Sequence, residues 1–90
     1  MAEMAPRSAH APITPEKALQ FFRISSGASL RDLNAAYRKA VRKYHPDHNP
    51  ARAEWAHNAM LRINAAYDVA LDYLANLQYE QVQRHLDREI

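Results

Sequence analysis

The 90-residue sequence contains no cysteine and a single glycine, and each scarcity excludes a class of protein. Without cysteine there are no disulfides, no thiolate chemistry and no cysteine-ligated zinc, and this absence is compatible with any compartment. One glycine leaves no glycine-rich loop to hold a phosphate. Apolar residues make up 48% of the chain and charged residues 24%, which is typical of a folded domain and not of a disordered segment.

Long hydrophobic runs and a large net charge are missing as well. No stretch approaches the length of a membrane span, and the N-terminus lacks an apolar segment of signal-peptide length, so we expect a cytoplasmic protein without membrane contact. A net charge of +2 gives no strong signal for a polyanionic partner at the level of the whole chain. No alternating run of β-branched or aromatic residues predicts a strand, and the abundant Ala, Leu, Arg and Gln favour helix, so we expect one small all-α domain.

The chain divides into three expected parts. Residues 1–13 lack periodicity and predict a flexible N-terminal leader, residues 14–77 predict the helical core, and residues 78–90 predict a C-terminal helix or extension. The core begins with Thr14-Pro15-Glu16, which combines a hydroxyl N-cap, proline at the first helical position and an acid in the first turn. This first helix is short and should end near Phe22 or Arg23.

The segment Leu30–Tyr44 is strongly amphipathic. Ser29 and Asp32 resemble a capping box at its start, and the helix must end near Tyr44 because a proline follows shortly after. At 100° per residue the apolar side chains fall within an arc of roughly 100°, and the cations fall within roughly 140° on the opposite side. The apolar arc consists of Leu30, Leu33, Tyr37, Ala40, Val41 and Tyr44, and the basic face consists of Arg31, Arg38, Lys39, Arg42 and Lys43.

A second amphipathic segment follows the polar connection His45–Pro50. It starts around Arg52, and its apolar stripe contains many alanines, which indicates a close approach of the preceding helix. Two long antiparallel helices joined by a short, proline-stiffened connection are therefore expected. The stripe consists of Trp55, Ala56, Ala59, Met60, Ile63, Ala66, Tyr67, Ala70, Leu74 and Leu77.

Beyond Leu77 the apolar direction changes. Tyr79, Val82, Leu86 and Ile90 form a new stripe, rotated by roughly 140° from the first. The change predicts either a separate short helix that packs back, which we favour, or one long helix that offers a second apolar face to a partner.

The tripeptide His45-Pro46-Asp47 adjoins the basic face, and this linkage favours a recognition surface over a plain polar turn. His45, His48 and Asp47 lie in a loop with two prolines and lack the spacing of a zinc site, so we expect no metal. Neither a nucleophile elbow nor a phosphate-binding glycine loop is present, so hydrolytic and kinase chemistry have no visible apparatus, and we expect neither a cofactor nor an enzyme. Among the cations there is no Asn or Gln to contact base edges, which favours an acidic protein surface over nucleic acid as the partner.

These residues together resemble a known family. Leu33, Tyr37-Arg38-Lys39, Val41, Lys43-Tyr44-His45-Pro46-Asp47 and Asn49-Pro50 resemble the second helix and loop of the J-domain of DnaJ-type co-chaperones. Ile63-Asn64-Ala65-Ala66-Tyr67-Asp68-Val69 resembles the third helix of that domain, and the likeness extends from about Pro15 to Leu74.

The resemblance implies a J-domain bundle that binds a DnaK-type chaperone and stimulates its ATP hydrolysis, so the chain would be an activator and not an enzyme. It also implies roles for the residues: Asp47 would pair with an arginine of the chaperone, and His45 and Pro46 would hold the loop. The docking cations would be Arg38, Lys39, Arg42 and Lys43. Two alternatives stay open, namely a basic nucleic-acid-binding module and a J-like adaptor without stimulating activity that pairs with itself or a scaffold through the C-terminal stripe.

The chain departs from the family pattern at three places. Arg23 stands where the family commonly has glycine after the first helix, and His48 replaces a frequent arginine or lysine. Past Leu74 the usual basic and Tyr-Asp pattern of the fourth helix is missing.

Overall fold

The computed structural model describes residues 13–89, with side chains described through Val82. This part of the chain is helical and contains no strand, which confirms the predicted all-α class. The helices are α1 (Pro15–Phe22), α2 (Leu30–Tyr44) and α3 (Ala53–Glu89), and two short 3-10 turns, η1 (Pro46–His48) and η2 (Pro50–Arg52), connect α2 to α3. The predicted leader falls almost entirely on residues 1–12, outside the described residues.

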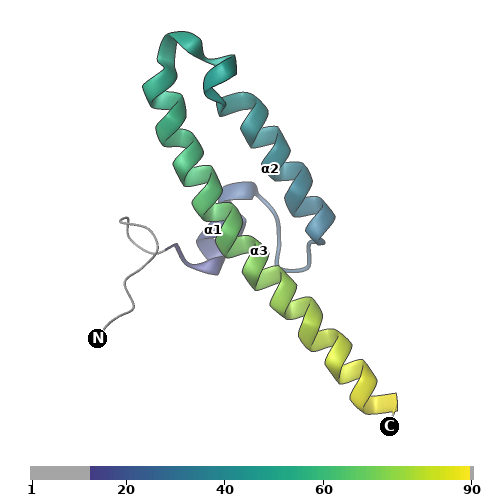
Figure 1. Cartoon of the computed structure of the whole chain (residues 1–90). Coiled ribbons are helices and arrows are strands. Elements are labelled where there is room, and N and C mark those ends of the chain that lie inside the picture. The colour runs from purple at the N-terminus through teal and green to yellow at the C-terminus, as the bar shows by residue number, and fades with distance from the viewer. Residues whose placement is uncertain (1–12, 90) are drawn as a thin grey trace, which may run out of the picture.

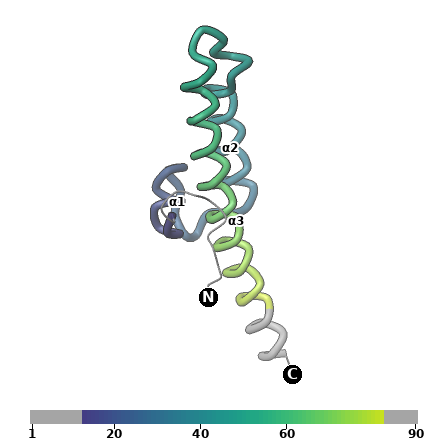
Figure 2. The backbone as a smooth tube through the Cα atoms, turned by 60° about the vertical axis from the view of Figure 1, so that its left-hand side comes forward, coloured from purple at the N-terminus to yellow at the C-terminus, as the bar shows by residue number. Residues whose placement is uncertain are grey.

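The arrangement is a helical hairpin with a third helix packed against it (Figure 1). Helices α2 and α3 run antiparallel, α1 lies against the middle of α3, and the C-terminal end of α3 projects beyond both partners, as Figure 2 also shows. The two predicted long antiparallel helices are therefore confirmed. None of the described helices combines the length and the apolarity needed to cross a membrane.

Helix α1 begins and ends with local hydrogen bonds that its sequence supplies. Thr14 Oγ1 accepts a hydrogen bond from the Lys17 N–H at 3.2 Å, and Pro15 occupies the first helical position. At the other end the Arg23 N–H donates to Gln20 O and the Ile24 N–H donates to Leu19 O, both at 3.0 Å. These two bonds form a Schellman motif, in which the residue after the helix adopts a left-handed conformation.

Helix α2 begins with the predicted capping box. Ser29 Oγ accepts a hydrogen bond from the Asp32 N–H at 3.0 Å, and Asp32 Oδ2 accepts one from the Ser29 N–H at 3.2 Å. These bonds fix the start of α2 and thereby orient its apolar arc.

The core is thin and lies where the three helices meet. Small alanines in α1 and α3 let the backbones approach closely around the larger apolar side chains. The buried core consists of Ala18, Leu19, Phe22, Leu33, Ile63, Ala66, Ala70 and Leu74.

A reciprocal pair of hydrogen bonds, which we call the tyrosine clasp, fixes α2 against α3. The Tyr37 hydroxyl donates to Asn64 Oδ1 at 2.9 Å, and the Tyr67 hydroxyl donates to Asn34 Oδ1 at 2.7 Å. The two tyrosine rings lie against each other with centroids 4.5 Å apart. Each helix contributes one asparagine and one tyrosine, so a slide of either helix along the other would break both bonds together.

The preference for a separate C-terminal helix is wrong. Helix α3 is continuous from Ala53 to Glu89, because no proline or glycine interrupts it and its residues are mostly good helix formers. The change in apolar direction past Leu77 occurs within this one helix, where the Tyr79 side chain is 64% exposed and the Val82 side chain 54% exposed. The side chains of Leu86 and Ile90, which complete the predicted stripe, lie outside the described ones.

Candidate partner-binding site

The turn His45–Asn49, which we call the tip, is held by an unusually complete set of local hydrogen bonds. The His45 N–H donates to Val41 O at 2.9 Å and closes the last turn of α2. The His48 N–H then donates to His45 O at 2.9 Å, and the Asn49 N–H donates to Pro46 O at 3.0 Å. With φ fixed at Pro46, these bonds leave the backbone of the tip little freedom.

Two side chains of the tip replace backbone donors that the end of α2 lacks. In a continuing helix Arg42 O would accept from residue 46, but Pro46 has no N–H. The His48 ring fills this place, since its Nδ1 lies 2.6 Å from Arg42 O. Asn49 Nδ2 donates to Lys43 O and to His45 O, both at 3.0 Å, and therefore anchors the tip to the helix.

The His45 ring orients Asp47. Its Nδ1 accepts a hydrogen bond from the Asp47 N–H at 3.0 Å, and the same nitrogen lies 3.7 Å from Asp47 Oδ2. The Asp47 side chain is nevertheless 85% exposed, and the His45 side chain is 40% exposed. The tip therefore presents a carboxylate to solvent from a backbone that is pinned in place.

The basic face leads directly to the tip. All five of its cations are exposed, as the amphipathic pattern of α2 predicts. Arg42 and Lys43 lie in the last turn of α2, where positive charge is favoured by the partial negative charge of the helix C-terminus. Arg38 and Lys39 lie one turn earlier on the same exposed side. The predicted site residues thus lie on the exposed part of α2 and in the tip that follows it, where Asp47 supplies a carboxylate.

Behind the tip, aromatic packing joins α2 and α3 at the loop end of the hairpin. The ring centroids of Tyr44 and Trp55 are 5.4 Å apart, and Arg52 Cζ lies 3.9 Å from the centroid of the Trp55 ring. Trp55 was expected in the core stripe, but it is 40% exposed and lies outside the buried core, so that assignment is wrong. Among residues 13–89, no further element covers it at the first turn of α3.

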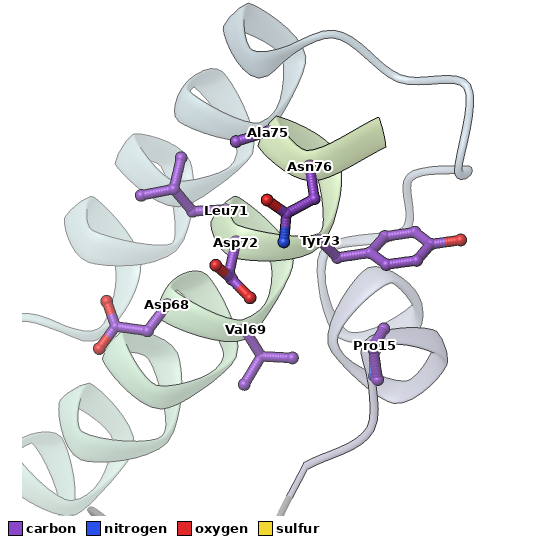
Figure 3. Close-up of a pocket in the computed structure, with 8 residues that line it drawn as sticks. All are labelled: Pro15, Asp68, Val69, Leu71, Asp72, Tyr73, Ala75 and Asn76. Carbon is purple, nitrogen blue, oxygen red and sulfur yellow. The ribbon is translucent and has the colours of Figure 1, made fainter. Parts of the chain in front are cut away.

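The other polar clusters of the described residues do not form a comparable site. No group of three or more His, Asp or Glu side chains with metal-binding geometry occurs among them. A hollow of about 650 Å³ lies beside the start of α1 and the middle of α3. Figure 3 shows that its lining side chains come mostly from successive turns of α3, with Leu71 and Tyr73 pointing to opposite sides of that helix.

The supporting residues of the tip were not identified from the sequence. Asn49 was named only in the likeness to the J-domain loop, and His48 only as a rejected metal ligand and as a departure from the family pattern. A signal was present, because a proline at position 46 leaves the carbonyl of residue 42 without its usual donor, and a nearby donor side chain is one of the ways to replace it. The tyrosine clasp was also missed, although α2 and α3 both contain asparagine and tyrosine three residues apart.

Comparison with known proteins gives a consistent result. The family model of the DnaJ domain matches residues 18–80. The chaperone protein DnaJ of Orientia tsutsugamushi (strain Boryong) is 41% identical over 63 residues, which cover 70% of this chain and 16% of that protein. The chaperone protein DnaJ of Clostridioides difficile is 43% identical over 58 residues, which cover 64% of this chain and 15% of that protein.

A eukaryotic relative matches to a similar extent. An uncharacterised J domain-containing protein of Schizosaccharomyces pombe is 41% identical over 58 residues, which cover 64% of this chain and 15% of that protein. No solved structure matches the chain.

The chain belongs to the DnaJ-domain family, because the family model covers well over half of its length and includes α2 and parts of α1 and α3. The region of likeness predicted from the sequence, about Pro15 to Leu74, lies largely within the matched residues. The matched part spans only about a sixth of the length of the curated relatives. A DnaJ-type co-chaperone role follows at the level of the domain.

Proposed function

We propose that this chain docks on a DnaK-type chaperone through the tip and four cations of the basic face, all except Arg31, and that docking stimulates the chaperone's ATP hydrolysis. The observation that carries the proposal is the exposed Asp47 carboxylate on a pinned backbone, directly beside the cations of α2. The partner-binding residues of this proposal are His45, Pro46, Asp47, Arg38, Lys39, Arg42 and Lys43. The chain acts as an activator in the cytoplasm, and the ATP is bound by its partner.

The geometry supports different roles for the cations of the basic face and for Asp47. Arg38 and Lys39 are exposed and surrounded by solvent, so they attract an acidic surface at long range and raise the association rate more than the affinity. Asp47 is a single anion at the end of this positive field. It can pair with one cation of the partner, such as an arginine, only when the basic face is docked in one orientation.

The direct test compares single-turnover ATP hydrolysis by a DnaK-type chaperone with the wild-type chain and with Asp47→Asn. We expect the stimulation by the variant to be at least about tenfold weaker than that by the wild type, since the substitution removes the carboxylate charge and keeps the shape of the side chain. Asp68→Asn is the matched control, because Asp68 is also exposed and lies on α3 away from the tip. Equal stimulation by the wild type and Asp47→Asn would overturn the proposal.

Nucleic acid is the alternative partner for the basic face, and one contact argues against it. Asn34, the amide side chain on the same helix as the cations, is already engaged by the Tyr67 hydroxyl at 2.7 Å. If nucleic acid is the partner, binding should fall steeply with salt and should survive Asp47→Asn. The absence of measurable binding at low salt would dispose of this alternative.

The exposed C-terminal end of α3 favours a second candidate, an adaptor that pairs with itself or a scaffold without stimulating the chaperone. Tyr79 and Val82 are 64% and 54% exposed, which is unusual for two large apolar residues one turn apart. Sedimentation of the chain truncated after Leu77 tests this role. Loss of assembly on truncation would support it, and an unchanged oligomeric state would exclude this end of α3 as the interface.

A further inference from the structure

An aromatic groove lies behind the tip and shares no residue with the tip or the basic face. It forms where α1, the end of α2 and the first turns of α3 meet, and its volume is about 280 Å³. Two elements far apart in the sequence supply its walls, and a fully buried side chain, Ile63, supplies its floor. The groove is lined by Phe21, Tyr44, Trp55, Ala59, Arg62 and Ile63.

The two aromatic walls are exposed and yet held in place. Phe21 is 48% exposed and Trp55 is 40% exposed, although rings of this size are normally covered. Phe21 packs edge-on against Phe22 with ring centroids 5.0 Å apart. The Trp55 ring contacts both the Tyr44 ring and the guanidinium of Arg52. A ligand that enters between Phe21 and Trp55 therefore meets preorganised surfaces, and little side-chain freedom is lost on binding.

Charge and size restrict what can occupy the groove. Arg62 lines it, Arg52 packs on one of its walls, and none of the six lining residues is acidic. These two cations beside an apolar lining favour an occupant that carries negative charge next to an apolar group. A volume of 280 Å³ lies below the roughly 300–1,000 Å³ of small-molecule pockets, which suits one or two side chains of a peptide better than a whole cofactor.

We propose that this groove docks a short acidic segment of a partner polypeptide. One aromatic or aliphatic side chain of the segment inserts between Phe21 and Trp55 above Ile63, and neighbouring carboxylates pair with Arg62 and Arg52. Guanidinium groups suit this pairing because they bind carboxylates through two parallel hydrogen bonds. Since the groove is separate from the tip and the basic face, the segment can bind without a chaperone and can hold a third protein beside it.

The sole tryptophan of the chain is a wall of the groove, so its fluorescence reports occupancy directly. The full chain is titrated with a short peptide that carries a central Leu-Phe pair flanked by Asp and Glu. Two comparison peptides replace the acids by Lys, or the Leu-Phe pair by Ser. We expect saturable change of the emission with the first peptide and at least about tenfold weaker binding of the other two.

Two charge-reversed variants, which both keep the tryptophan, distinguish the effect of a charge in the groove from the effect of the net charge of the chain. Arg62→Glu should weaken the acidic peptide at least about tenfold, because it places a carboxylate in the groove. Arg31→Glu changes the net charge equally but lies at the start of α2, roughly 20 Å from Tyr44 along the helix. It should leave the affinity within about twofold of the wild type. Equal weakening by the two variants, equal binding of the Ser and Leu-Phe peptides, or no emission change up to millimolar peptide would each overturn the proposal.

Discussion

Arg23 adopts φ 59° and ψ 42°, a left-handed conformation that side chains with a Cβ rarely occupy. It is the single non-glycine residue with positive φ among the described residues. The Schellman motif at the end of α1 requires this conformation, and glycine is the residue that adopts it most easily. The departure from the family pattern noted in the sequence is therefore a local strain in the structure.

Replacing Arg23 by glycine should stabilise the domain. The left-handed conformation costs an L-residue about 1–2 kcal/mol, and part of the gain is lost because glycine has more freedom in the unfolded chain. We expect Arg23→Gly to raise the free energy of unfolding by about 0.5–1 kcal/mol in urea denaturation. Arg23→Ala is the control, since it removes the charge but keeps the Cβ. A gain of the same size in Arg23→Ala would show that charge, and not backbone strain, is responsible.

The two histidines of the tip should occupy opposite tautomers when neutral. His45 Nδ1 accepts the Asp47 N–H, so its proton belongs on Nε2. His48 Nδ1 faces the Arg42 carbonyl, which can only accept, so His48 must carry a proton on Nδ1. Long-range ¹⁵N–¹H correlation spectra of the two rings at slightly alkaline pH measure this directly. Observing the same tautomer at both positions would contradict the hydrogen-bond pattern of the tip.

At the scale of the elements, the tyrosine clasp determines how α2 lies along α3. Tyr37→Phe and Tyr67→Phe each remove one hydroxyl and leave an asparagine without its partner, so each should lower the free energy of unfolding by about 1 kcal/mol. Tyr79→Phe is the matched control, because this tyrosine is 64% exposed and should change stability by less than about 0.5 kcal/mol. Thermal or urea denaturation of the three variants measures the difference. Equal effects at all three positions would mean that the clasp does not contribute.

Most of the elements followed from the sequence because their signals are local. Thr14, Ser29 with Asp32, and Pro46 act within one turn of their own position, so the ends of α1 and α2 could be predicted closely. The boundaries of the basic face followed from helical periodicity alone. The exposure of Trp55 could not be predicted in this way, because periodicity gives the direction of a side chain and not whether another element covers it.

The break in the apolar stripe past Leu77 was misinterpreted for a related reason. A change of apolar direction shows that the surroundings of a helix change, and this happens when a helix leaves its neighbours as well as when it turns. The absence of proline and glycine was the stronger indication of continuity. The hydrogen bonds of Asn49 and the clasp join residues that become neighbours only after folding, so single-sequence periodicity does not detect them.

For the whole molecule, the continuity of α3 predicts a long, well-defined distance. The chain has no cysteine, so Ala53→Cys and Gln81→Cys give a clean pair of spin-labelling positions. In one straight helix these residues are separated by roughly 42 Å along the axis. Pulsed electron–electron double resonance should show a single distribution near that value. A distribution centred well below about 30 Å would indicate a helix that bends and packs back.

The tip and the projecting end of α3 lie at opposite ends of the molecule, whose longest dimension is 59 Å (Figure 1). One unbroken helix connects them and therefore fixes the distance between them. A molecule bound at the far end of α3 would be kept about 50 Å from a molecule bound to Asp47, and the two could touch only if one of them is large. The size of the two bound molecules, and not only their affinity, would then decide which pairs this small protein can bring into contact.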